Sequence, residues 1–236
     1  MHLYIIRHAD PSYNPDGLTE NGYKESKVLA NRLKDYGVNK IYSSNMVRAK
    51  LTAEPTSKLL NIDVNIHKWL MEPEELKIVQ SNQEYCIWDT YGETIRQYDQ
   101  MPTKNDWYTK HPFDNPRVKE SWEKFVVNCD EFLLSLGYKR VNGRFEVIKE
   151  NNDRIAIFTH NGTCLYFLSY LLEIPLPLVF SGFYCWPSSL TDIYFDQRSS
   201  KWAIPRALCV ADTSHLASEK LKPQARGMGD YCPEYY

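Results

Sequence analysis

The sequence lacks several features that would place a protein in a class at once. Its 236 residues carry a formal net charge of −2, so there is no basic surplus of the kind that nucleic-acid binding usually requires. The six cysteines form no CxxC pair and show no regular spacing, which argues against a zinc site and against a disulfide-framed secreted fold. We therefore expect reduced thiols and no nucleic-acid partner, and any anion site must be local.

Long hydrophobic runs are also missing. No segment offers about 18 consecutive apolar residues, and the N-terminus has no basic region followed by an apolar stretch of signal length. The sequence thus favours a cytoplasmic protein with no membrane partner. Hydrophobic residues make up 43% and charged residues 25% of the chain, which is ordinary for a globular protein, so a sizeable core is expected.

Strand and helix patterns alternate through the first third of the chain. Thr19 is a good helix cap and Gly37 a good helix end, while Pro55 marks a kink or a restart inside the next helix. Such alternation is typical of a mainly parallel sheet covered by helices. In order, the patterns predict strands at 2–6, 39–44 and 64–67 and, between them, helices at 19–37 and 46–60.

The same alternation returns in the last third. An apolar strand is followed by an apolar helix that Pro175 stops, and two closing strands come next. The tail, residues 220–236, has no periodicity and is expected to be a peripheral or partly disordered loop. The predicted elements are a strand at 154–160, a helix at 162–174 and strands at 191–196 and 202–210.

Between about residue 73 and residue 152 the alternation lapses. This stretch holds one strong helix pattern, at 118–137, between loops rich in aromatic residues and proline. We interpret it as an insertion that caps one edge of the sheet. The sequence therefore predicts an α/β fold, with residues 1–236 as a single domain. Its form is a three-layer α/β/α sandwich with a mostly parallel central sheet and a helical cap insertion at approximately 73–152.

Charged side chains stand where two apolar strands end. Arg7 and His8 follow the first strand, and His160 and Asn161 follow the strand of the last third, at the start of a helix. Ligands of open parallel sheets bind outside the carboxyl ends of the strands, so the two histidines are expected to face each other. The free N–H groups at the helix start, including that of Asn161, can receive an anion.

Two further residues complete a predicted phosphate pocket. Arg48 lies in the first turns of a helix that follows a strand, and with Arg7 it supplies two guanidinium forks that match phosphate geometry. Glu72 comes just after the third strand, where its carboxyl group could protonate a leaving-group oxygen. No histidine or cysteine elsewhere stands at metal-ligand spacing, so no metal site is expected.

These pieces, taken in order, resemble the histidine phosphatase superfamily, which has the phosphoglycerate mutase-like fold. The matching segments are RHADPSYN, GLTENG, YSSNMVRAKLTAEP, the segment around Glu72 and THNG. The resemblance is good over about the first 75 residues and roughly over 154–175, and it holds elsewhere only in outline. Ala9 stands where the family motif usually has glycine.

The resemblance implies a role for each matching residue. His8 would attack phosphorus and form a phosphohistidine intermediate, and Glu72 would donate the proton. The phosphoryl group would be bound by Arg7, Asn14, Arg48 and His160. The resemblance thus implies a metal-independent phosphatase that needs no cofactor and acts on a small phosphorylated molecule.

Two alternatives remain open at this point. One is a cofactor-dependent phosphoglycerate mutase of the same fold, and the other is a non-catalytic module that binds a phosphorylated ligand. Such mutases typically extend the first motif with a further asparagine, a phenylalanine and a Gly-Trp pair, whereas here Asn14 is followed directly by PDGLT. That difference favours hydrolysis. The joint presence of His8 and its expected partners favours an enzyme over a binding module.

Overall fold

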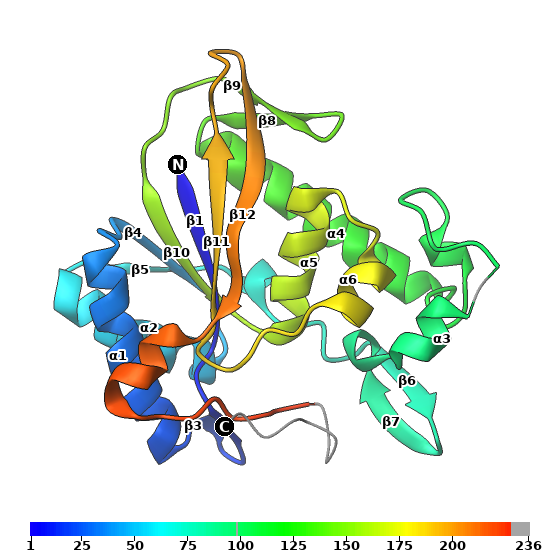
Figure 1. Cartoon of the computed structure of the whole chain (residues 1–236), viewed down its shortest axis with the longest axis horizontal. Helices are drawn as coiled ribbons and strands as arrows, with labels where there is room; N and C mark the ends of the chain where they lie inside the picture. The colour runs from blue at the N-terminus through cyan, green and yellow to red at the C-terminus, as the bar shows by residue number, and fades with distance from the viewer. Residues whose placement is uncertain (98, 228–236) are drawn as a thin grey trace.

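The first strand is apolar on both of its faces, and this explains its place at the centre of a sheet. Leu3 and Ile5 of β1 (His2–Arg7) pack into one hydrophobic core, and Tyr4 and Ile6 pack into a second core on the opposite face. Because side chains alternate along a strand, a strand of this kind must be covered on both sides. The structure, a computed structural model, describes residues 1–97 and 99–227 (Figure 1).

The central sheet has eight strands and is parallel in one half only. From β5 to β1 neighbouring strands run parallel, and from β1 to β8 they run antiparallel. The predicted α/β sandwich is therefore confirmed, with a mixed sheet. In spatial order the strands are β5 (Val64–Ile66), β4 (Lys40–Ser43), β10 (Arg154–Thr159), β1, β11 (Leu190–Asp196), β12 (Trp202–Asp212), β9 (Arg144–Val147) and β8 (Tyr138–Val141).

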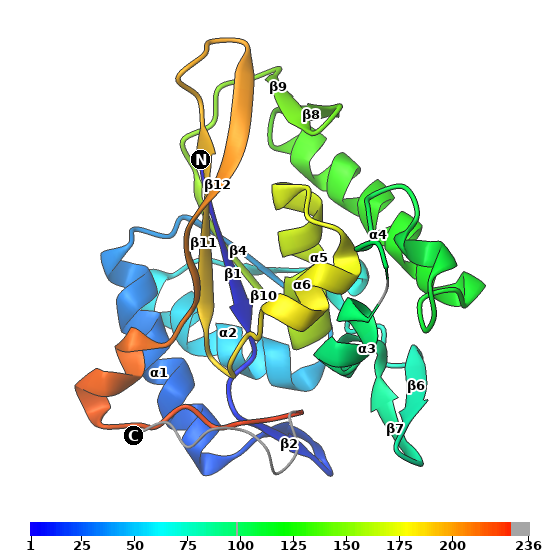
Figure 2. The ribbon, with the colours of Figure 1, turned by 45° about the vertical axis from the view of Figure 1, so that its right-hand side comes forward.

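Helices form a layer on each face of this sheet, as the two views in Figures 1 and 2 show. One layer contributes Leu29, Leu33 and Ala53 to the core that contains Tyr4 of β1. The other layer contributes the apolar residues of α5, which is buried along nearly its whole length. The first layer is α1 (Glu20–Asp35) and α2 (Val47–Leu60), and the second is α4 (Pro116–Ser135), α5 (Asn161–Leu172) and α6 (Leu176–Gly182).

The start of α1 is fixed against the loop that follows β1. The Thr19 hydroxyl accepts a hydrogen bond from the Gly22 N–H at 3.0 Å, as expected for a helix cap. A Cβ atom at Gly22 would lie 2.2 Å from the Asp10 carbonyl oxygen, so only glycine allows this close approach. In the next helix the chain continues through Pro55 as one element, so of the predicted kink or restart the restart is wrong.

Residues 73–152 include a long helix and a β-hairpin that extends the sheet. The helix α4 lies over α5, while the β8–β9 hairpin pairs with β12 and lengthens the sheet at its edge. The β8–β9 hairpin falls inside the predicted insertion. The sequence did not predict it, because its short strands carry little periodicity. Between Lys68 and Thr109 the described chain also forms β6 (Lys77–Gln80), β7 (Gln83–Cys86) and α3 (Gly92–Arg96), with the short 3-10 helices η1 (Lys68–Leu70), η2 (Ile87–Asp89) and η3 (Trp107–Thr109).

Two segments far apart in the sequence lie near the loop after β1. The hairpin of β2 (Pro11–Tyr13) and β3 (Asp16–Leu18) follows that loop, and the segment after η4 (Ser214–Glu219) returns to it (Figure 2). Within the predicted tail loop, Arg226 makes an ion pair with the buried Asp10 carboxylate. Residues 228–236 lie outside the described part of the chain. None of the described helices has the length and apolar character to cross a membrane.

Candidate active site

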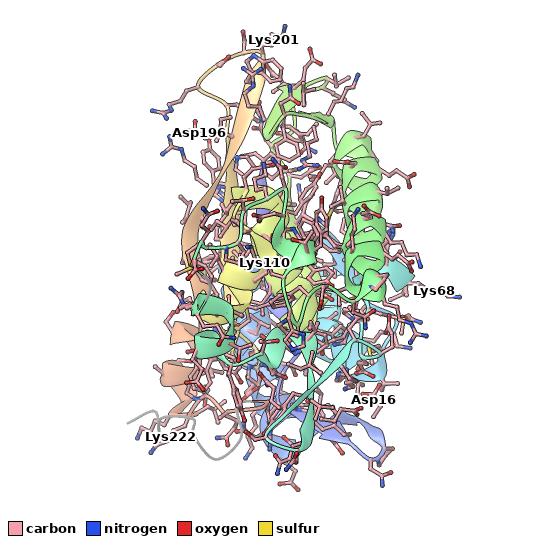
Figure 3. All side chains as sticks on the ribbon, turned by 90° about the vertical axis from the view of Figure 1, so that its right-hand side faces the viewer. Asp16, Lys68, Lys110, Asp196, Lys201 and Lys222 are labelled. Carbon is pink, nitrogen blue, oxygen red and sulfur yellow. The ribbon has the colours of Figure 1, made fainter. Side chains whose placement is uncertain are left out.

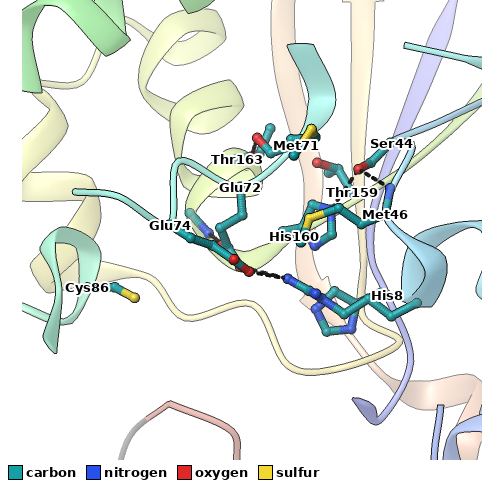
Figure 4. A network of polar contacts seen from close by, with 12 residues as sticks. His8, Ser44, Met46, Met71, Glu72, Glu74, Cys86, Thr159, His160 and Thr163 are labelled. Atoms are coloured by element: carbon teal, nitrogen blue, oxygen red, sulfur yellow. Dashed lines mark hydrogen bonds and ion pairs between the residues drawn. The ribbon is translucent and has the colours of Figure 1, made fainter. Parts of the chain in front are cut away.

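The parallel pairing of β1 with β10 brings the two predicted histidines together. Arg7 and Thr159 are opposite each other in the register, and each is followed directly by a histidine. The rings of His8 and His160 have their centroids 5.2 Å apart. Figure 4 shows both rings together with Glu72 and Glu74, whose side chains come down toward them from a neighbouring loop.

His8 is held in the tautomer that a nucleophile needs. Its ring is 1% exposed, and Nδ1 lies 2.8 Å from the Ala9 carbonyl oxygen. A carbonyl only accepts, so Nδ1 carries the proton and Nε2 keeps its lone pair. Burial, followed by the charges of Arg7 and Arg48, holds the pKa of His8 well below its usual range. The imidazole is therefore neutral near pH 7.

Ala9, the departure from the family motif, fits its position without strain. The residue is fully buried, and its N–H donates to the Thr52 hydroxyl at 2.9 Å. It is absent from the described non-glycine residues that have positive φ, so its backbone lies where a Cβ is tolerated. The geometry that orients His8 is thus compatible with alanine.

His160 is fully buried, and one of its ring nitrogens is left without a partner. Its Nε2 lies 2.9 Å from the Ser44 hydroxyl, which joins the end of β10 to the end of β4. Its Nδ1 has no hydrogen-bond partner among the residues that the structure describes. Burial, and then the neighbouring His8, keep the pKa of His160 well below its usual range. A buried ring nitrogen in this state is available to a ligand.

Arg7 points its guanidinium group between two main-chain carbonyls. Nη1 donates to the Cys185 oxygen at 2.6 Å, and Nη2 donates to the Arg226 oxygen at 3.2 Å. The side chain is buried, and its Nε has no partner among the described residues. Some N–H groups of the Arg7 guanidinium therefore make no hydrogen bond within the described residues and can donate to an oxyanion.

Arg48, at the start of α2, is held by carboxylates instead. Nη1 donates to Asp16 at 3.0 Å and Nη2 to Glu74 at 2.6 Å, while Glu72 lies at 4.0 Å. Asp16 also accepts the N–H of Val47 at 2.9 Å and so caps α2, whose Met46 offers no side-chain cap. This guanidinium is as buried as that of Arg7, but its charge is shared with acidic neighbours.

Glu72 contacts the start of α5, where the sequence predicts that free N–H groups bind an anion. Its Oε1 accepts the Gly162 N–H, at the first turn of α5, at 2.5 Å. A Cβ atom at Gly162 would lie 2.5 Å from the Trp88 ring, which explains the glycine. Burial raises the pKa of Glu72, and the charge of Arg7 and the Gly162 hydrogen bond only partly oppose it. The carboxyl group is thus disposed to carry a proton.

The two asparagines of the predicted site differ in burial and in their contacts. Asn14 occupies the exposed turn between β2 and β3, and its side chain makes no hydrogen bond within the described residues. Asn161 is buried, and its Oδ1 accepts the Cys185 N–H at 3.3 Å. Asn161 therefore fixes the same loop that supplies a carbonyl to Arg7.

Four residues near the site had no assignment from the sequence. Asp10 binds the Arg226 side chain, and Tyr184 binds the Arg226 main chain. Asp89 lines a cavity of about 710 Å³ together with Asn161 and Tyr184. Burial, with a contribution from Glu72, raises the pKa of Asp89 to about 7. Only Asp10 had a usable signal, because it lies inside the RHAD motif.

The donor set of this centre could hold a metal, but its electrostatics suit an anion. One ligand atom from each of His8, Glu72 and His160 lies within 4.8 Å of the others. Two buried guanidinium groups, those of Arg7 and Arg48, lie close enough to lower the pKa of both histidines. The same positive field opposes a divalent cation and favours a phosphate dianion.

Comparisons with known proteins agree with this geometry. A family model of the histidine phosphatase superfamily (branch 1) matches residues 3–204. Phosphoserine phosphatase 1 of Hydrogenobacter thermophilus is 26% identical over 207 residues, which cover 83% of this chain and 87% of that protein.

Solved structures show the same fold at lower identity. The crystal structure of a phosphoserine phosphatase from Entamoeba histolytica, in complex with 3-phosphoglyceric acid, has a TM-score of 0.61 at 19% identity and covers 91% of this chain and 98% of its own. The alpha-ribazole phosphatase from Shigella flexneri has a TM-score of 0.55 at 19% identity, with 90% and 97% covered. Because the family model spans most of its length, this chain belongs to branch 1 of the histidine phosphatase superfamily.

Proposed function

We propose that the protein is a metal-independent phosphatase that hydrolyses small phosphomonoesters through a phosphohistidine on His8. The observation that carries the proposal is the hydrogen bond from His8 Nδ1 to the Ala9 carbonyl, which leaves a neutral Nε2 beside two buried guanidinium groups. The phosphatases among the relatives support the same reaction class. The five described cysteines are all free, which fits the expected reducing cytoplasm.

The first step transfers the phosphoryl group to the protein. The substrate dianion binds against Arg7 and Arg48, whose charges balance that of its equatorial oxygens. The neutral His160 ring donates a hydrogen bond from Nδ1, while its Nε2 accepts the Ser44 hydroxyl. His8 Nε2 then attacks phosphorus while the bond from phosphorus to the ester oxygen breaks. Glu72, in its acid form, gives its proton to the departing oxygen, and the alcohol leaves.

The second step returns both groups to their starting state. A water molecule attacks phosphorus, and the Glu72 carboxylate takes one of its protons as the N–P bond breaks. Inorganic phosphate then leaves, with His8 neutral and Glu72 protonated again. A dianion bound beside Glu72 adds to the effect of burial and raises the pKa of this carboxyl further, which keeps the acid form available.

The substrate's alcohol portion has room beside this centre. The cavity of about 710 Å³ that Asn161 and Tyr184 line reaches η2 and carries the Asp89 carboxyl. Its size suits a metabolite rather than a polymer. We therefore propose a small-molecule substrate, in line with the phosphoserine phosphatases among the similar proteins.

The test compares the wild type with His8→Ala on p-nitrophenyl phosphate. We expect the variant to lose activity by on the order of 10⁴-fold or more, because the nucleophile is removed, and to melt near the wild-type temperature. His111→Ala is the matched control, since that histidine is 80% exposed in a loop. An unchanged rate in His8→Ala would refute the nucleophile.

Two additions to the assay separate the alternatives. Phosphate release should survive EDTA, and loss of activity on chelation would show that the metal-free mechanism is wrong. With 3-phosphoglycerate and a trace of 2,3-bisphosphoglycerate, we expect slow phosphate release and no rapid isomerisation. Rapid isomerisation would identify a mutase, and no turnover of any phosphomonoester would favour a binding module.

A further inference from the structure

Arg226 lies at the active site although it stands 216 residues after Asp10 in the chain. Its Nε donates to Asp10 Oδ1 at 2.6 Å and its Nη2 to Asp10 Oδ2 at 3.1 Å, so the contact is a two-pronged ion pair. The Asp10 carboxylate is 3% exposed and also accepts the Thr19 hydroxyl at 2.6 Å. The side chain of Arg226 is thus anchored two residues from His8.

The main chain of the same residue is held a second time. The Arg226 carbonyl accepts the Tyr184 hydroxyl at 2.7 Å, and the Arg226 N–H donates back to that hydroxyl oxygen at 2.9 Å. The same carbonyl is the acceptor for Arg7 Nη2 at 3.2 Å. Fixing this residue costs conformational entropy, and five hydrogen bonds at a single position offset that cost.

We propose that Arg226 is a positioning residue, whose main-chain carbonyl orients the Arg7 guanidinium toward phosphate. Together with the Cys185 carbonyl it fixes the plane of the Arg7 fork from two sides. Both acceptors are neutral, so the fork is oriented without losing its charge. The inference rests on the proposed phosphatase function, since it assigns a purpose to the orientation of Arg7.

The ion pair has a second consequence for an anionic substrate. Asp10 is a buried carboxylate beside the nucleophile, and Glu25, whose Oε2 accepts the Asp10 N–H at 2.8 Å, lies behind it. Without the guanidinium of Arg226, the buried negative charge of Asp10 would lose its ion-pair partner two residues from His8. Loss of Arg226 should therefore weaken phosphate binding both by freeing Arg7 and by exposing that charge.

The experiment measures the binding of inorganic phosphate by isothermal titration calorimetry, with kcat and KM for p-nitrophenyl phosphate beside it. We expect Arg226→Ala to weaken phosphate binding about 10-fold, because an oriented hydrogen bond to a charged group is loosened. KM should rise more than kcat falls. Lys222→Ala is the matched control, since Lys222 lies on the same segment with an exposed side chain (Figure 3), and it should bind phosphate as the wild type does.

Two further variants test the route through the main chain. Tyr184→Phe keeps the ring that lies over Arg7, 5.6 Å from its Cζ, but removes the hydroxyl that holds Arg226. It should weaken phosphate binding about 3-fold, and the double variant with Arg226→Ala should lose less than the product of the two effects. Arg226→Lys should recover only part of the loss, because lysine lacks the fork.

The outcomes separate this inference from the proposed function. If the wild type binds phosphate and hydrolyses p-nitrophenyl phosphate while Arg226→Ala matches it in phosphate affinity, only the role of Arg226 is refuted. Equal weakening in Arg226→Ala and Lys222→Ala would also refute it, since the effect would then belong to the whole segment. If the wild type neither binds phosphate nor turns over, the proposed function fails and the role of Arg226 fails with it.

Discussion

The end of β1 and the start of α2 each place one arginine in the phosphate pocket, and the two are held in different ways. Arg7 is bound by two carbonyl oxygens, those of Cys185 and Arg226. Arg48 is bound by the carboxylates of Asp16 and Glu74. Both guanidinium groups are almost fully buried, so exposure does not distinguish them.

The difference between these regions lies in how much charge each offers to a ligand. A carbonyl orients a guanidinium through a dipole and leaves its net charge intact, whereas a carboxylate neutralises much of it. Arg7 is therefore ready for an anion before the anion arrives. Arg48 must share its charge between the ligand and its acidic neighbours, of which Glu74 is about half exposed and free to turn to water.

The difference between the two arginines is tested most strongly by replacing them one at a time. Arg7→Gln should lower kcat/KM for p-nitrophenyl phosphate by on the order of 10³-fold, because it removes an oriented full charge. Arg48→Gln should cost on the order of 10²-fold, since its charge is already partly neutralised. Steady-state kinetics measure both, and thermal melting shows whether each variant folds.

Equal losses in the two variants would show that the carboxylates do not weaken the charge that Arg48 offers to the ligand. So would a larger loss at Arg48, because that outcome would mean that the carboxylates tune the position of the guanidinium rather than weaken its charge. Lys50→Gln is a suitable control for the second variant, since Lys50 lies on the same helix with an exposed side chain.

The next effect concerns Glu72, whose Oε2 lies 4.0 Å from Arg48 Nη2 and whose carboxyl also feels the charge of Arg7. Glu72→Gln should lower kcat/KM for an alkyl phosphate by on the order of 10²-fold and change p-nitrophenyl phosphate far less, because only the alkoxide needs a proton to leave. Since burial raises the pKa of Glu72, the acid form persists above its usual range and is lost as pH rises.

A pH profile of kcat/KM tests the direction of this pKa shift. The wild type should lose activity toward the alkyl phosphate on the alkaline side, through the pKa of Glu72, and Glu72→Gln should lose this limb. On the acid side, burial lowers the pKa of His8, so the neutral nucleophile should persist below pH 6.5. An alkaline limb that survives in Glu72→Gln would show that another group is the acid.

The features that the sequence could predict are those set by local patterns. The apolar runs before His8 and His160 mark two strands, and the alternation between them predicts parallel neighbours, so both histidines could be placed at one edge. Thr19 and Gly37 likewise predicted the bounds of α1 to within a residue or two. In each case the signal and the structure lie within a few residues of each other.

The contacts that hold the arginines could not be predicted in this way. Arg226 lies in a segment without periodicity, and its partner Asp10 stands at the other end of the chain. Asp16 belongs to a three-residue strand, which is too short to show an alternation. Such pairs depend on how distant segments pack. The two arginines could therefore be predicted from the sequence, but the groups that accept their hydrogen bonds could not.

The smallest expected effect is a gain, and it tests the shared charge of Arg48 directly. Glu74→Gln removes the charge that binds Nη2 at 2.6 Å while keeping a polar side chain of the same shape. Inorganic phosphate should then bind about 3-fold more tightly, because the carboxylate no longer competes with the ligand for the guanidinium. Glu75→Gln is the matched control, since the adjacent side chain is exposed and makes no ion pair with Arg48 in the described part of the chain. Weaker phosphate binding in Glu74→Gln would mean that Glu74 positions Arg48, and the two arginines would then be oriented by different atoms for the same purpose.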